Sequence, residues 1–373
     1  MNRRNVLALA TALCLSACDS PPVGPEQPNF CAPDTKASAA CRPFTGSLAS
    51  CKCSVDDYSP RFNNSQNDTW PACISDAYSG KYVPVGTSTS AAGRTLAFDQ
   101  MGALLWKKGS IPTSADFTSA RDLYATSQGI GSRVARRQDI HYPEVPGNDK
   151  FACSTEAVAI QYPDRCAGPG RLKPIIDAAF VDGIANNKPW VQAARIEAAL
   201  LWFSYLSTLS EQWTSSFDNL ADVDSSCGYF MGGTERSKPT GLGKYIQQLD
   251  AETYDRAFDG ILAARCFRDL DKALPSTCTL FYDRAIQQTD KALIRGMALI
   301  LRDRMARVLV VAGEQQQAEM QFVNVLGLLL DRAARAIDST RADTLKIITQ
   351  ATTVNGMNVS QGQAQIDALF SCP

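Results

Sequence analysis

The sequence predicts an all-α protein, a helical bundle preceded by an irregular, cysteine-rich segment. Three observations lead to this fold class. From about residue 96, apolar residues recur with the 3.6-residue period of a helix. Turn residues separate these periodic stretches, and no strand pattern follows residue 95, as expected of an antiparallel bundle. Residues 31–95 instead hold five cysteines between Cys31 and Cys73, in a stretch rich in Pro, Asn, Ser and Asp.

The N-terminus has the form of a secretory signal. Arg3 and Arg4 precede a run of apolar residues from 6 to 17, which matches the charged and apolar regions of an export signal. A membrane-spanning helix needs about 20 apolar residues, so this run is too short to remain as a span. We therefore expect residues 1–17 to be removed as a signal peptide.

The end of this run, Leu15-Ser16-Ala17-Cys18, resembles the lipobox of bacterial lipoproteins. The resemblance implies that the chain is cut before Cys18 and that both the Cys18 thiol and the new amine are acylated. Several acyl chains give stable attachment to a membrane. Residues 18–30 are rich in proline and predict a stiff, solvated tether. The expected location is therefore a bacterial membrane, facing the periplasm or the cell surface.

Thirteen cysteines in an exported chain predict disulfides. Cys14 leaves with the signal and Cys18 carries lipid, so an odd number remains and at least one is free or paired between chains. The expected local pairs are Cys153 with Cys166, and Cys266 with Cys278, because each closes a short loop that contains proline. Residues 31–95 cannot build a core of their own and need such covalent links. Cys51-Lys52-Cys53 is interpreted as two structural cysteines, with metal or redox chemistry as the alternative.

The α-helical domain is expected over residues 96–373, with helices at 96–106, 115–128, 171–185, 189–213, 253–274, 280–311, 318–337 and 340–352. Ser114 is the expected N-cap of the second helix, with Asp116 in its first turn. Pro189 suits the first turn of the fourth helix. Most of the circumference of that helix is apolar, which places it inside the bundle. Pro275 ends the fifth helix, and Gly313 marks the break after the sixth.

Two stretches look irregular, residues 133–166 and residues 218–243. The second combines several glycines with Tyr229, Phe230 and Met231. Long loops often carry function, so these three residues are predicted to form an exposed binding loop. The alternative is that Cys227 fixes the loop to the body of the protein.

One internal similarity suggests a duplicated helical hairpin. The segment from Asp177 to Ile184 resembles the segment from Asp255 to Ile261, with a one-residue insertion or deletion between them. Each segment precedes a longer and more apolar helix.

The net charge, the missing motifs and the single histidine exclude several classes of function. The formal net charge of −1 does not suit a nucleic-acid-binding protein. The chain has no P-loop, no dinucleotide-binding glycine motif and no G-x-S-x-G nucleophile motif. It also has a single histidine, His141, which excludes any site that needs two imidazoles.

His141 and Glu144 form an H-x-x-E pair, and on a helix both side chains would face a metal ion. The spacing is similar to the G-x-H-x-x-E motif of the imelysin-like proteins, which are exported all-α bundles. Asp139 stands where that motif has glycine, and Pro143 disfavours a helical turn. Two interpretations therefore remain: His141 and Glu144 bind a divalent metal together, or His141 is an ordinary histidine in a loop.

Glu197 lies in a very apolar helix and is expected to be partly buried and paired. Arg195 lies on another face, so Arg265, Arg295 and Arg302 are the candidate partners. A carboxylate site in the bundle, with His141 and Glu144, is the functional alternative to a structural ion pair.

These observations lead us to expect a membrane-anchored envelope lipoprotein with a non-catalytic binding or scaffolding role. Its partner would be an unknown envelope protein or ligand, bound through the aromatic, glycine-rich loop or an exposed helix groove. The alternative is binding of a metal or small ligand in the bundle. An enzyme is the least favoured class.

Overall fold

The computed structural model describes residues 60–61, 64–65, 82–84, 90–126, 129–146, 152–214, 220–273 and 279–371. Most of these residues are helical, which confirms the all-α fold class. The described residues also include a pair of two-residue strands, β1 (Pro60–Arg61) and β2 (Asn64–Ser65), which run antiparallel. The signal peptide, Cys18 and the tether lie outside the described residues.

The described residues form α-helices and a few short 3₁₀- or π-helical segments. In chain order they are α3 (Ser90–Leu104), α4 (Ser114–Ala125), α5 (Ile130–Val134), η2 (Ala152–Ser154), α6 (Glu156–Gln161), η3 (Gly168–Leu172), α7 (Lys173–Ile184), α8 (Pro189–Thr214), α9 (Leu220–Met231), α10 (Gly241–Leu249), α11 (Ala251–Ala273), α12 (Thr279–Val308), α13 (Gly313–Ile337), α14 (Ser339–Thr349), η4 (Val354–Gly356) and α15 (Val359–Leu369).

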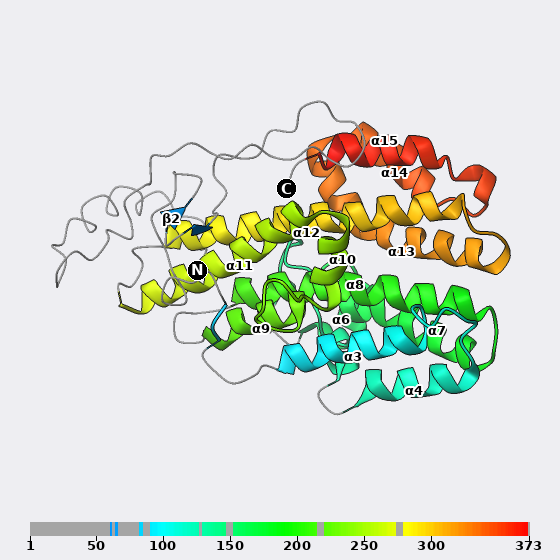
Figure 1. Ribbon diagram of the computed structural model, residues 1–373, viewed down its shortest axis with the longest axis horizontal. Helices are drawn as coiled ribbons and strands as arrows, with labels where there is room; N and C mark the ends of the chain where they lie inside the picture. The colour runs from blue at the N-terminus through cyan, green and yellow to red at the C-terminus, as the bar shows by residue number, and fades with distance from the viewer. Residues whose placement is uncertain are drawn as a thin grey trace.

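The helices lie in layers with their long axes roughly parallel, from α3 and α4 at one side to α14 and α15 at the other (Figure 1). Helix α8 lies near the middle, where it packs against α7, α9 and α13. Helices α11 and α12 pack along each other, and α12 also contacts α13 and α15. The long helices α8, α12 and α13 therefore form the centre of the bundle.

Helix α8 is buried around its whole circumference from Ala198 to Leu209. Leu200, Leu201 and Phe203 follow one another in sequence, so they point to different sides, yet each is at most 2% exposed. This confirms the predicted central position. Burial of each such side chain stabilises the fold by roughly 1.5–3 kcal/mol. Helix α8 therefore contributes a large share of the stability of the core.

Local sequence signals set several helix ends. Helix α4 is capped by Thr113 rather than by the predicted Ser114, and Asp116 completes a capping box. Helix α8 begins at Pro189 as predicted. Gly313 opens α13 with φ +64°, a conformation that favours glycine. Helix α14 begins after Asp338, whose side chain accepts from the amide of Arg341.

Several predicted boundaries are wrong. The stretch 133–166, expected to be irregular, contains helix α6. Helix α3 begins at Ser90, inside the segment expected to be irregular. The loop expected over residues 218–243 contains helix α9, and Tyr229, Phe230 and Met231 are at most 2% exposed in the core. They therefore do not form an exposed binding loop. Within the described part of residues 218–243, the irregular chain lies between α9 and α10 and begins at Gly232 with φ +72°.

The cysteines partly test the disulfide predictions. Cys153 and Cys166 form a disulfide, as predicted. Cys266 is also disulfide-bonded, but its expected partner Cys278 lies outside the described residues. Cys227 is a free, buried thiol, so it does not fix its segment covalently.

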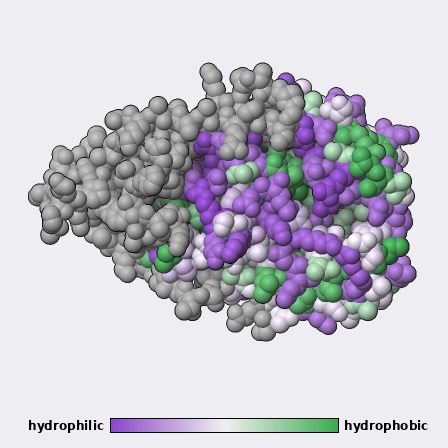
Figure 2. Space-filling model, in the orientation of Figure 1, coloured by the Kyte–Doolittle hydropathy of each residue, from purple (hydrophilic) through white to green (hydrophobic). Residues whose placement is uncertain are grey.

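The surface is mainly hydrophilic on the face shown in Figure 2, with separate hydrophobic patches. Among the described helices, none contains a stretch long and apolar enough to cross a bilayer. The two segments of the suspected duplication fall in α7 and α11, and each precedes a longer helix that packs against it. The duplication itself stays a prediction.

Candidate functional site

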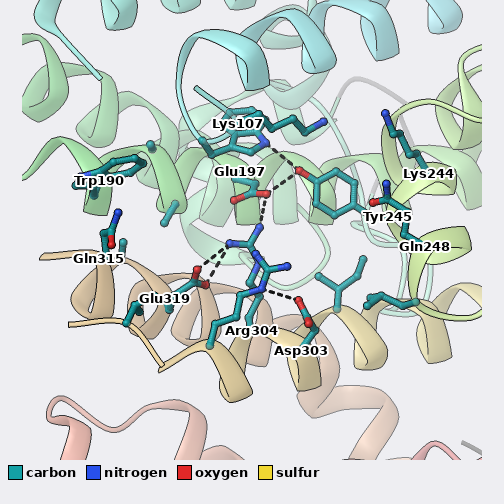
Figure 3. Close-up of a pocket in the computed structure, with 18 residues that line it drawn as sticks. Lys107, Trp190, Glu197, Lys244, Tyr245, Gln248, Asp303, Arg304, Gln315 and Glu319 are labelled. Atoms are coloured by element: carbon teal, nitrogen blue, oxygen red, sulfur yellow. Dashed lines mark hydrogen bonds and ion pairs between the residues drawn. The ribbon is translucent and has the colours of Figure 1, made fainter. Parts of the chain in front are cut away.

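A pocket of about 600 Å³ opens between helices α8, α10, α12 and α13 (Figure 3). Its floor is made by small and buried side chains, among them Ala193 and Ala194 of α8 and Ala318 of α13. Alanine at these positions leaves space that a larger side chain would fill. A volume of this size lies within the range of small-molecule sites in proteins.

Glu197 is the deepest charged group of this pocket. Its side chain is 1% exposed, which confirms the predicted burial. One carboxylate oxygen, Oε1, accepts a hydrogen bond of 2.7 Å from the Tyr245 hydroxyl and one of 2.5 Å from Arg304. Tyr245 in turn accepts a bond of 2.9 Å from the indole of Trp106. The result is a continuous chain of hydrogen bonds along one wall (Figure 3).

Arg304 extends this chain to helix α13. Its guanidinium donates to Glu319 at 3.1 Å and lies over the ring of Phe322, 4.2 Å from the centroid. Burial alone would lower the pKa of Arg304, but Glu197 and Glu319 outweigh burial and raise it. The side chain therefore stays charged and holds α8, α12 and α13 together at the pocket.

The other oxygen of Glu197, Oε2, is buried and accepts no hydrogen bond from any described residue. In Figure 3 this oxygen points away from Tyr245, towards the side where Trp190 lies. Burial raises the pKa of Glu197, while Arg304 and the Tyr245 hydrogen bond counteract part of that increase. A buried acceptor without a donor is costly, so its place at a pocket wall is a sign of function.

The rim of the pocket is polar and aromatic. Trp190 stands in the first turn of α8, and its backbone amide donates to Glu314 at 2.7 Å. Lys244 and Gln248 project from α10, and Gln315 from α13 (Figure 3). Lys107 pairs with Asp99 at 3.0 Å and Arg307 with Asp303 at 2.9 Å. The pocket thus combines aromatic faces with side-chain amides and paired charges.

The predicted arginine partners of Glu197 are wrong, because each binds a different carboxylate. Arg302 pairs with Asp367, Arg295 with Asp250 and Arg265 with Asp224. Arg304 is one turn after Ile300, which also lines the pocket, whereas Arg302 faces α15. Residues two positions apart on a helix point in nearly opposite directions, so the arginines of one helix separate into different ion pairs.

His141 lies in a second polar centre, within the chain between α5 and η2. Its Nδ1 lies 2.7 Å from Asp139 and its Nε2 lies 2.8 Å from Asp290 of α12. The Tyr205 hydroxyl donates to the other Asp290 oxygen at 2.8 Å, and its ring stacks on the imidazole. Burial would lower the pKa of His141, but the hydrogen bonds to Asp139 and Asp290 raise it to about 9.

The structure does not bring the predicted metal ligands together. Glu144 is exposed, and His141 and Glu197 bind different partners in different networks. In the part of the chain that the structure describes, no group of three His, Cys, Asp or Glu side chains could hold a metal ion. Both imidazole nitrogens already face carboxylates, an arrangement that favours the protonated ring over a metal ligand.

Sequence reasoning found Glu197 but missed the rest of this site. Tyr245, Arg304 and Trp190 come from three helices that are far apart in the chain. The available signal was Trp190 beside the helix-starting Pro189, which places a large aromatic ring at a helix end. Comparison of the chain with protein-family models, curated proteins and solved structures finds no match.

Proposed function

We propose that the protein is a lipid-anchored protein of the bacterial cell envelope with a non-catalytic role, and that it binds a small polar molecule in the Glu197 pocket. The observation that carries the binding role is the unpartnered, buried Oε2 of Glu197 at the wall of a cavity of about 600 Å³. A ligand that donates a hydrogen bond there would satisfy this group and stabilise the folded protein.

The binding role is tested with the full chain, purified in detergent from an oxidising compartment. Thermal unfolding is measured with neutral sugars, amino acids, organic acids and nucleosides. We expect one class to raise the melting temperature, and Ala194→Leu, which fills the pocket floor, to abolish that increase. Circular dichroism checks that the variant is folded. If no class raises the melting temperature, or if Ala194→Leu responds like the native chain, the pocket is not a binding site.

The anchoring role is supported by the sequence of residues 1–18. We expect the chain to incorporate an alkyne-labelled fatty acid in cells and to sediment with membranes. Cys18→Ser should remove the label and release the protein, while Cys14→Ser, a matched change within the signal, should keep both properties. Label that remains in Cys18→Ser would show that the lipid is attached elsewhere or that the anchor is of another kind.

Metal binding at His141, Glu144 or Glu197 stays a separate prediction. It is tested by elemental mass spectrometry on protein purified without chelator or affinity metal. A near-stoichiometric metal that is lost in His141→Ala would place the metal at His141. A metal-free, folded protein would remove this alternative.

A further inference from the structure

The chemistry of the pocket walls narrows the class of ligand. Two of the five tryptophans of the chain, Trp106 and Trp190, line this one pocket together with Tyr245. The Trp106 indole donates a hydrogen bond to Tyr245. Trp190 and Tyr245 lie on opposite sides of Glu197 (Figure 3). Aromatic faces of this kind attract the polarised C–H groups on the flat face of a sugar ring.

Most charged side chains that line the pocket form ion pairs. Lys107 is bound to Asp99, Arg304 to Glu197 and Glu319, and Arg307 to Asp303. Lys244 is the one lining cation that forms no ion pair with a described residue, and it is exposed at the rim. An anionic ligand would be repelled by the buried Glu197 carboxylate, and a cationic ligand would be repelled by Arg304, which already lies between Glu197 and Glu319. A neutral ligand avoids both repulsions.

The unsatisfied hydrogen-bonding capacity suits hydroxyl groups. Glu197 Oε2 needs a donor, and the amides of Gln248 and Gln315 each offer both a donor and an acceptor. A hydroxyl can donate to the carboxylate and accept from an amide. The volume of about 600 Å³ is compatible with a ligand of about one or two sugar rings.

We propose that the pocket binds a neutral saccharide, with one ring stacked on Trp190 and a hydroxyl donating to Oε2 of Glu197. This inference rests on the proposed function, because it names the ligand class of the same pocket. The shared chemistry is a hydroxylated ring, which a free sugar or an uncharged glycan segment of the envelope would supply.

The test is calorimetric titration of the full chain at pH 8, with maltose and N,N′-diacetylchitobiose as neutral probes. Glutamate, lysine and citrate serve as charged probes. We expect a neutral probe to bind and the charged probes not to bind. Tighter binding of diacetylchitobiose would point to a glycan strand, and tighter binding of maltose to a free sugar; either result supports a saccharide.

Single substitutions test whether the sugar ring stacks on Trp190 and whether a sugar hydroxyl binds Glu197. Trp190→Ala should weaken sugar binding at least ten-fold, and Trp190→Phe should restore part of it. Trp213→Ala is the matched control, because Trp213 is 60% exposed at the other end of α8 and should leave binding unchanged. Glu197→Gln keeps an oxygen for Arg304 but puts an amide in place of Oε2, so it should also weaken binding at least ten-fold. Glu235→Gln, on the exposed surface, is its control.

The outcomes separate the two proposals. If a charged probe binds and Ala194→Leu abolishes that binding, the pocket is a binding site and the saccharide inference is wrong. If a sugar binds equally well to Trp190→Ala and Glu197→Gln, it binds elsewhere and the inference is again wrong. If no probe binds, the measurement contradicts the ligand class as well as the proposed binding role.

Discussion

Two polar centres connect helices α8 and α12, and they differ in how completely they are satisfied. In one, Glu197 of α8 binds Arg304 of α12; in the other, Tyr205 of α8 binds Asp290 of α12. His141 completes the second centre, so that both oxygens of Asp290 and both imidazole nitrogens have partners. In the first centre, Oε2 of Glu197, a residue that lines the pocket, is buried and has no donor among the described residues.

The difference indicates what each centre does. The two centres lie on α8 only eight residues apart, which is about 12 Å along the helix. Both are at least partly buried, so both have paid the cost of removing charge from water. We call the His141 centre the closed centre, because its polar groups have partners; it fixes the chain around His141 to the bundle. We call the Glu197 centre the open centre, because Oε2 has no donor among the described residues. An acceptor left without a donor is the arrangement expected of a ligand site.

The largest expected effect comes from removing Arg304. Arg304→Met keeps an unbranched apolar stem but removes the guanidinium, so Glu197 stays buried without this cation. We expect the free energy of unfolding to fall by about 3–5 kcal/mol, measured by urea denaturation. Arg302→Met is the matched control on the same helix, because the Arg302–Asp367 pair is more exposed. An equal loss in both variants would show that the buried network at the pocket has no special role.

Removing the Cys153–Cys166 disulfide should affect the His141 centre but not the Glu197 centre. The Cys153–Cys166 loop lies beside the segment that contains His141, since the backbone amide of Asp139 donates to the carbonyl of Arg165 at 2.7 Å. Replacing both cysteines with serine should lower stability by about 3 kcal/mol, because the unfolded chain gains freedom. Any ligand affinity of the Glu197 pocket should be unchanged. Loss of binding together with stability would show that the two centres are coupled.

The closed centre should make stability depend on pH. Because the folded protein raises the pKa of His141 from 6.5 to about 9, its charge contributes stability that is fully present below about pH 6.5. This contribution, up to about 3 kcal/mol, should be lost as the pH rises through about 9. His141→Asn should lack that dependence between pH 6 and 10 in urea denaturation. Parallel pH profiles for both chains would contradict a charged His141.

The smallest expected effect concerns the hydroxyl of Tyr245. Tyr245→Phe removes one of the two donors to Glu197 Oε1 and the acceptor of the Trp106 indole. Since Arg304 remains, the free energy of unfolding should fall by only about 1–2 kcal/mol. A loss as large as that of Arg304→Met would mean that Tyr245 stabilises the buried Glu197 as much as the arginine does.

Much of the bundle could be predicted from the sequence, because periodicity and helix-end residues are local signals. The pattern around Pro189 gave the start and the central position of α8. Helix α9 was missed because its Ser and Gly residues resemble a loop, although Val223, Cys227 and Phe230 recur at helical spacing. Burial against neighbouring helices outweighs weak helix propensity there.

The site could be predicted only in part. Glu197 was identifiable because a carboxylate in an apolar helix needs a partner. Which arginine pairs with it depends on the rotation of α12 against α8, and this rotation is a property of the whole bundle. The same limit applies to His141, whose second carboxylate, Asp290, is 149 positions away in the chain.

The free thiol of Cys227 has a practical consequence. It is 2% exposed, and burial raises its pKa, so an alkylating reagent can reach a reactive thiolate only when α9 opens. The rate at which the peptide containing Cys227 becomes alkylated therefore reports how often this part of the native fold opens. A ligand that stabilises the closed bundle should therefore lower the rate at which Cys227 is alkylated.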